Sequence, residues 1–154
     1  MTTQPSNAVQ VAKNIRKGLK AQGLKATVKI RNDEAVRVII IDATQKQYEA
    51  AWVFCNRFQL GNFCGMTDIY VENNENVDIA QVDYVIVDLQ FSDSIKQEVA
   101  DKLSTEYNLP PMTSNDLPET ILIGGHEQST RHLVQSILIG GVYPLGNFWD
   151  KRAA

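Results

Sequence analysis

Cysteine and histidine are the residue types in this chain best suited to nucleophilic or metal chemistry, and each occurs twice. Cys64 lies in the stretch N-F-C-G-M-T-D-I-Y at residues 62–70, between two aromatic residues and shortly before Asp68. Cys64 could act as a nucleophile only with a histidine brought close by folding, and nothing in the sequence indicates such an arrangement. The stretch therefore predicts a connection between elements, either packed against a sheet or presented to a partner.

The two histidines, His126 and His132, are separated by five residues in H-E-Q-S-T-R-H. A helical zinc pair needs a spacing of about three or four, so that both rings face one side of the helix. Gly124 and Gly125 come before Ser-Thr without an intervening lysine, which does not fit a phosphate loop, although a backbone anion nest stays open. We predict no metal site, no cofactor and no enzymatic activity.

Charge is distributed unevenly along the chain, whose net charge is −3. Residues 1–31 carry seven basic and no acidic residues, whereas residues 68–119 carry twelve acidic residues and two lysines. Such segregation predicts one surface that attracts anions and another that attracts cations, unless the segments neutralise each other in the fold. The pI of about 5.3, and the lack of aromatic residues among the N-terminal lysines, argue against a dedicated nucleic-acid-binding protein.

Hydrophobic periodicity predicts the elements that position these residues. Apolar residues at helical spacing indicate a first helix opened by Asn7 and Gln10, and a period of two indicates a strand at residues 24–31. A second strand at residues 35–41 completes a hairpin, and Thr44 begins a capping box for a second helix. The buried stripe of this second helix is expected to be Tyr48, Ala51, Trp52, Cys55 and Phe58.

A strand at residues 84–91 and a third helix, capped at Ser92 or the residue after it, complete a core domain at residues 1–107. The order α-β-β-α-β-α, followed by a C-terminal appendage, predicts an α+β fold. In it, a small antiparallel or mixed sheet has helices packed on one face. Three prolines make residues 108–118 a linker, and residues 119–154 form the appendage, packed on the core or on a partner.

The chain shows no sequence signal for a membrane or for secretion. No apolar run reaches the ~18 residues that span a bilayer, and the N-terminus lacks the charged start and apolar block of a signal peptide. We therefore expect a cytoplasmic protein without a membrane partner, in which Cys55 and Cys64 stay reduced.

Three stretches resemble the large polyvalent protein-associated domains of phages, plasmids and conjugative elements, over residues 8–107 as a whole. They are a helix-then-strand opening at residues 11–30, the stretch at residues 57–70 that contains the motif Asn62–Tyr70, and a strand that ends in serine at residues 83–93. Cys64 stands where that family is expected to have an aspartate before Gly-Met-Thr-Asp. The resemblance implies a setting in mobile elements, often beside anti-defence modules, and it transfers no catalytic residue.

The leading hypothesis is an accessory protein, not an enzyme, that inhibits a host defence protein or nucleoprotein complex of the CRISPR or restriction type by protein–protein contact. The alternative is a nucleic-acid-binding accessory protein, and a third option is self-association through the appendage. The candidate acidic face is Asp93, Glu98, Asp101 and Glu106. The candidate partner-binding loop is Phe63, Met66, Asp68 and Tyr70, although packing of Phe63, Met66 and Tyr70 against the sheet is the favoured interpretation. The alternative nucleic-acid-binding set is Lys13, Arg16, Lys17 and Lys20.

Overall fold

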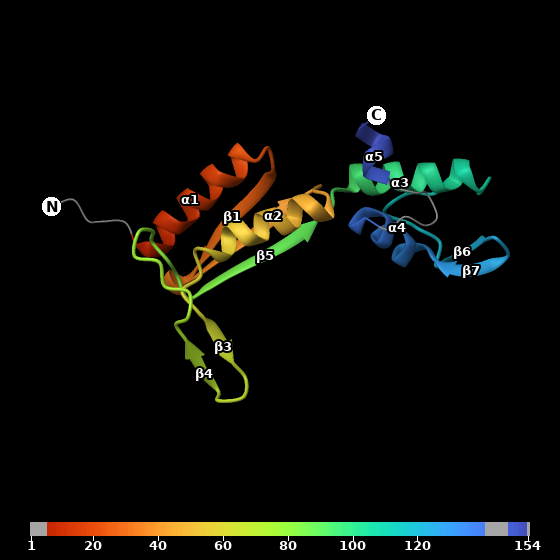
Figure 1. Ribbon diagram of the computed structural model, residues 1–154. Coiled ribbons are helices and arrows are strands. Elements are labelled where there is room, and N and C mark those ends of the chain that lie inside the picture. Colours follow the sequence, from red (N-terminus) through yellow and green to blue (C-terminus); the bar gives the residue numbers. More distant parts are fainter. Residues whose placement is uncertain (1–5, 141–147, 154) are drawn as a thin grey trace. The chain divides into compact units, whose positions relative to one another are not determined.

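The computed structural model describes residues 6–140 and 148–153 (Figure 1). The chain divides into two compact units, an N-terminal unit ending at Gln90 and a C-terminal unit beginning at Phe91. Helices are combined with small mixed and antiparallel sheets, which confirms the predicted α+β class. Among the described residues, the longest apolar helical segment falls short of what a bilayer crossing requires.

The N-terminal unit is built on a three-stranded mixed sheet with the order β1-β2-β5. β1 and β2 form the predicted antiparallel hairpin, and β2 pairs with β5 in parallel. The chain between β2 and β5 contains helix α2. A separate two-stranded sheet, β3-β4, interrupts this crossover between α2 and β5. The elements are α1 (Asn7–Ala21), β1 (Lys25–Arg31), the 3-10 turn η1 (Asn32–Glu34), β2 (Ala35–Ile41), α2 (Gln45–Asn56), β3 (Asn62–Cys64), β4 (Ile69–Val71) and β5 (Tyr84–Gln90).

Side-chain caps set the starts of the helices. The Thr44 hydroxyl accepts from the backbone N–H of Gln47, whose side chain accepts in return from Thr44, so the predicted capping box is present. Ser6, not Asn7, caps α1 by accepting from Val9, and Asn7 is the first helical residue. The prediction was one residue late because serine and asparagine are both good N-caps.

Both helices of the N-terminal unit cover the same face of its sheet. Val36, Val38 and Ile40 of β2 point into this core, and α1 contributes its predicted apolar stripe. Gly18 lets α1 approach α2 closely, because a Cβ at this position would lie 2.0 Å from the ring of Phe54. The predicted stripe of α2 was wrong at Trp52, which is exposed, since Phe54 takes the place against α1.

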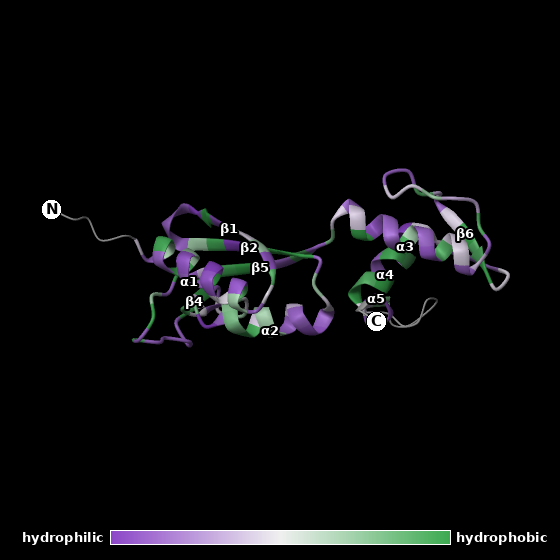
Figure 2. Cartoon of the chain, turned by 90° about the horizontal axis from the view of Figure 1, so that it is seen from above, coloured by the Kyte–Doolittle hydropathy of each residue, from purple (hydrophilic) through white to green (hydrophobic). Residues whose placement is uncertain are grey.

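The C-terminal unit packs helices against a second hairpin. Its elements are α3 (Asp93–Glu106), β6 (Thr120–Ile123), β7 (His126–Ser129), α4 (Thr130–Ile139) and α5 (Phe148–Ala153). The hydropathy colours of Figure 2 show α4 as mainly hydrophobic, which agrees with its buried Leu133, Val134, Ile137 and Leu138. Trp149 of α5 donates its indole N–H to the carbonyl of Leu138 at 2.8 Å and thereby holds the last helix on α4.

The boundary between the units falls before α3, whereas the sequence placed this helix in the core domain of residues 1–107. The buried side of α3 carries Ile95, Val99 and Leu103, and the helix packs on α4 of the C-terminal unit. Residues 108–118 contain no helix or strand, as the prolines predict, but they run along α3. Gln97 holds them there, since it donates to the carbonyl of Met112 at 2.8 Å and accepts from the N–H of Ser114. Residues 141–147 of the predicted appendage lie outside the described residues.

Candidate functional site

The stretch Asn62–Tyr70, singled out in the sequence, folds as the β3-β4 hairpin, which extends away from the three-stranded sheet (Figure 1). Cys64 pairs with Ile69, so residues 65–68 form the loop at the tip. Asp68 has a φ of 56° in the left-handed region, where aspartate is one of the better tolerated residues. Residues 62–71 thus contain both paired strands and, at Asp68, the residue that takes the left-handed conformation needed in the loop.

Apolar side chains on this hairpin face solvent. Met66 at the tip is 98% exposed, and Phe63 and Ile69 are more than half exposed. The prediction that Phe63 and Met66 pack against the sheet was therefore wrong, because β3 and β4 pair only with each other and no other element of the unit covers them. The alternative interpretation, a loop presented to a partner, fits the observed exposure.

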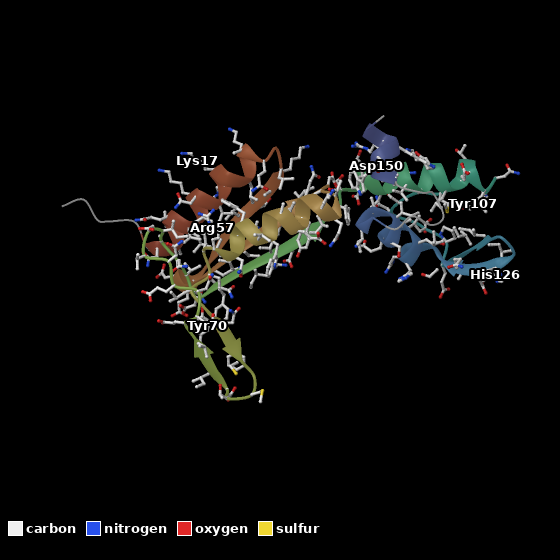
Figure 3. All side chains as sticks on the ribbon, viewed as in Figure 1. Lys17, Arg57, Tyr70, Tyr107, His126 and Asp150 are labelled. Carbon is white, nitrogen blue, oxygen red and sulfur yellow. The ribbon has the colours of Figure 1, made fainter. Side chains whose placement is uncertain are left out.

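Tyr70 is the residue of the motif that does pack on the rest of the unit (Figure 3). Its hydroxyl donates to the carbonyl of Asp83 at 2.5 Å, just before β5. Its ring meets the ring of Tyr84 edge to face, with the centroids 5.3 Å apart. Desolvation raises the pKa of the Tyr70 hydroxyl. Tyr70 therefore fixes the base of the hairpin, as the favoured sequence interpretation required of it.

Gln59 joins the hairpin to the main sheet. Its side-chain NH₂ donates to the carbonyl of Gly61 at 2.7 Å and to the Asn62 side chain at 3.1 Å. Its side-chain oxygen accepts from the backbone N–H of Val85 at 2.9 Å, so one amide connects the start of β3 to β5. Gly61 is required at this junction, because a Cβ there would lie 2.0 Å from the carbonyl oxygen of Val71.

Two further amide side chains hold the chain that returns from the hairpin. Asn74 donates to the carbonyls of Asn56 at 2.9 Å and Gln59 at 2.8 Å. Gln81 donates to the carbonyls of Arg57 at 2.9 Å and Asn74 at 2.7 Å, at the end of α2. The hairpin is thus attached to its unit by polar bonds at its base, while its tip stays free of contacts within the unit.

Cys64, the last residue of β3, is half-buried and accepts hydrogen bonds from the loop that follows it. The hydroxyl and backbone N–H of Thr67, together with the N–H of Met66, donate to its sulfur and lower the pKa of the thiol. The sulfur thus accepts the kind of loop hydrogen bonds that an aspartate in its place would accept. Burial raises the pKa of the other thiol, Cys55, to about 12, which agrees with its prediction as a packing residue.

The predicted acidic face lies on α3 and is partly neutralised by its own unit. Glu98 pairs with Arg152 of α5 at 3.0 Å, and Asp101 accepts from Gln97 at 2.9 Å. Asp93 opens α3, where a carboxylate complements the helix dipole. These acids do not form one uninterrupted anionic surface, because α5 and Lys102 bring positive charge to it. A surface groove of about 480 Å³ is lined by Glu98, Asp101, Lys102, Thr105, Glu106, Phe148 and Lys151.

The predicted basic set lies on the outer side of α1, where Figure 3 shows Lys17. Lys13, Lys17 and Lys20 are exposed and form no ion pair among the described residues. Arg16 is engaged in the fold, since it donates to the carbonyl of Val28 at 2.8 Å and so satisfies an acceptor at the edge of β1. The structure therefore leaves three of the four predicted residues available to a polyanion.

The two histidines are not brought together by the fold. His126 lies on β7 and His132 on α4, and both are exposed. Within residues 6–140 and 148–153, no group of three or more histidine, cysteine, aspartate or glutamate side chains could hold a metal ion. The amide anchors Gln59, Asn74 and Gln81 were missed in the sequence, where the only signal was the unusual density of asparagine and glutamine around the motif.

Comparison with known proteins gives no relative from which to carry over a role. No family model, no curated protein and no solved structure matches this chain. The resemblance of residues 8–107 to the mobile-element domains therefore stays a prediction from the quoted motifs, and the function is argued from the geometry of the chain itself.

Proposed function

We propose that this chain is a binding protein without catalytic activity that docks on a partner protein through the tip of the β3-β4 hairpin. The observation that carries the proposal is the near-complete exposure of Met66, between Phe63 and Ile69, on a hairpin held firmly at its base. Methionine adapts to irregular apolar surfaces, and aromatic residues supply much of the contact energy at interfaces. Such a tip fits an apolar pocket on another protein.

Attachment at the base favours binding. An isolated two-stranded hairpin is only marginally stable in water. Here the bonds of Gln59 and Tyr70 hold the hairpin before any partner arrives. Because the loop is already ordered, binding costs less conformational entropy than it would for a flexible segment.

The charge of the hairpin favours a protein with a basic surface over a nucleic acid. Residues 62–72 contain Asp68 and Glu72 and no basic residue. Phosphates would be repelled there, whereas positive side chains around an apolar pocket would be attracted. Host complexes that process nucleic acid carry such basic surfaces. The choice of a defence complex of a phage-infected or plasmid-bearing cell as the target rests on the resemblance of the Asn62–Tyr70 motif.

A triple variant of the hairpin tip tests the proposal. Phe63→Ser, Met66→Ser and Ile69→Ser together remove the apolar surface but touch no buried side chain, so the fold should be retained. Cells that carry a CRISPR or restriction system and express the chain are challenged with a susceptible phage. The wild type should raise the efficiency of plating, and the triple variant should abolish this gain. Losing even one central contact residue weakens binding about 30-fold or more.

A matched control replaces three apolar residues that are exposed elsewhere, Val53→Ser, Val77→Ser and Leu122→Ser. The control should protect the phage as the wild type does, and the same host protein should be captured from lysate by the wild type and the control only. Equal capture by the hairpin variant would show that the tip is not the docking site.

A further inference from the structure

One face of the three-stranded sheet in the N-terminal unit is covered by α1 and α2. Of the helices and strands described in that unit, none lies across the other face, although Tyr70 of β4 contacts it at Tyr84. Residues that are directly paired across strands point to the same side, so the register defines this open face completely. The residues that the central strand contributes to it are half-buried, and those of the edge strands are exposed, except for the half-buried Asp88. Four cross-strand rows make up the open face: Lys25–Ile41–Gln90, Thr27–Ile39–Asp88, Lys29–Arg37–Ile86 and Arg31–Ala35–Tyr84.

Positive charge on the open face is concentrated along β1. Arg37 on the central strand is paired with Asp88 at 2.9 Å, in an ion pair that remains partly accessible to solvent. The other three basic side chains form no ion pair among the described residues and occupy three of the four positions that β1 contributes to the open face, with Thr27 at the fourth. They are Lys25, Lys29 and Arg31.

Aromatic and apolar surface lies on the opposite edge, along β5. Tyr84 is 40% exposed and Ile86 is 48% exposed. The Tyr70 ring contacts Tyr84 edge to face at an interplanar angle of 72°, which holds the Tyr84 ring in place. Tyr84 and Arg31 lie two strand spacings, or about 10 Å, apart in one row. Ala35 lies between them, and its small side chain leaves a shallow depression in the surface.

We propose that this open face binds single-stranded nucleic acid, with phosphates along β1 and bases against Tyr84 and Ile86. A row of cations beside an aromatic platform is what a single strand requires, since every base can stack and every phosphate is charged. The N-terminal lysines have no aromatic residues between them in the sequence, but the parallel pairing of β2 with β5 supplies one from a distant strand. A duplex conceals its base faces and would gain nothing from Tyr84. This site is separate from the β3-β4 tip and does not depend on the hairpin's proposed role.

The test measures binding of a fluorescent oligothymidylate of about 12 nucleotides to the full chain by anisotropy, over a series of salt concentrations. The open-face variant Lys25→Gln, Lys29→Gln and Arg31→Gln is compared with the α1 variant Lys13→Gln, Lys17→Gln and Lys20→Gln, which removes the same charge from exposed positions. Each phosphate contact on a single strand contributes ~0.7 to the slope of log affinity against log salt. The open-face variant should therefore lower the slope by about 2, whereas the α1 variant should leave it unchanged.

Substitution of Tyr84 separates stacking from simple charge attraction. Tyr84→Leu keeps the apolar bulk and should weaken binding by about fivefold or more, while Trp52→Leu on α2, an exposed aromatic residue away from the open face, should have no effect. Thermal melting of both variants checks that the fold is retained.

Four outcomes would overturn the proposal. These are no binding by the wild type, equal losses in the two charge variants, duplex DNA bound as tightly as the single strand, and no response to Tyr84→Leu. A chain that self-associates at assay concentrations without binding the oligonucleotide would instead assign the open face to a second copy.

Discussion

The hairpins β3-β4 and β6-β7 have similar lengths but differ in how far their apolar side chains are buried. In β6-β7, alternate residues Ile121 and Ile123 are buried in the C-terminal unit while Leu122 faces solvent. In β3-β4, neither face is buried, and only Tyr70 and Cys64 are partly covered. One hairpin is held by apolar burial and the other by hydrogen bonds at its base.

The difference shows that hydrophobic residues on a strand can either stabilise the fold by burial or stay exposed for contact with a partner. Burial of Ile121 and Ile123 stabilises the C-terminal unit through the hydrophobic effect. Phe63, Met66 and Ile69 gain no such stabilisation in the free chain, and amide side chains perform the structural work instead. An apolar hairpin that is dispensable for its own core but rigidly held is suited to stabilising a complex.

The strongest test of this comparison is a pair of identical substitutions. Ile123→Ala removes a side chain that is 2% exposed and should lower the free energy of unfolding by about 2–5 kcal/mol, because it leaves a cavity. Ile69→Ala on β4, with 57% exposure, should change this free energy by about 0.5 kcal/mol or less. Urea denaturation followed by circular dichroism measures both. Similar losses in the two variants would mean that Ile69 is also part of a core.

A second pair tests whether the base, and not the tip, holds the β3-β4 hairpin. Gly61→Ala places a Cβ against the backbone carbonyl of Val71 and should cost about 1–3 kcal/mol, since a strand would have to shift. Gly65→Ala at the tip meets no atom within 4 Å and should stay within about 0.5 kcal/mol of the wild type. Hydrogen exchange should be faster at the β3-β4 amides in the first variant only, and equal exchange in both would contradict the assignment.

The smallest expected effect is a change in the pH dependence of alkylation at the tip. Hydrogen bonds from Thr67 and Met66 lower the pKa of Cys64, so its thiolate forms at a lower pH than that of an ordinary cysteine. Thr67→Ala removes the largest of these contributions and should shift the reaction midpoint with iodoacetamide to higher pH. Cys55, with its pKa raised to about 12 by burial, should stay unreactive in the folded chain and serves as the internal control. An unchanged midpoint in Thr67→Ala would show that the loop does not hold the thiolate.

Local patterns predicted most of the helices and strands. Helix α1 was predicted from its apolar stripe of Ala8, Val11, Ala12, Ile15 and Leu19. The start of α2 was predicted from the capping box of Thr44 and Gln47. In the segment that was predicted only as an appendage, helix α4 packs apolar residues at helical spacing on neighbouring elements. An error arose where apolar residues lie on more than one side of a helix, as with Trp52 and Phe54 of α2, because periodicity does not say which of them faces the partner helix.

The candidate sites were harder to predict than the helices and strands, because they depend on contacts between residues far apart in the sequence. The motif at residues 62–70 identified the correct segment, but its exposure followed from the absence of strand pairing with β5, which no local pattern indicates. Counting acidic residues over 68–119 could not reveal that Arg152 pairs with Glu98, because Arg152 lies near the other end of the chain.

By itself, the amino-acid sequence determined the α+β class, the capping box of α2, the buried face of α1 and the segregation of charge, since these depend on neighbours within a few turns of chain. Only the tertiary structure decided which surfaces stay open. The register of β2 with β1 and β5 places Tyr84 in line with Arg31, and the hydrogen bond from the Val85 N–H to the Gln59 side chain ties the base of the apolar hairpin to β5. Both arrangements join residues distant in sequence, and such contacts form only when the chain closes long loops around a common core.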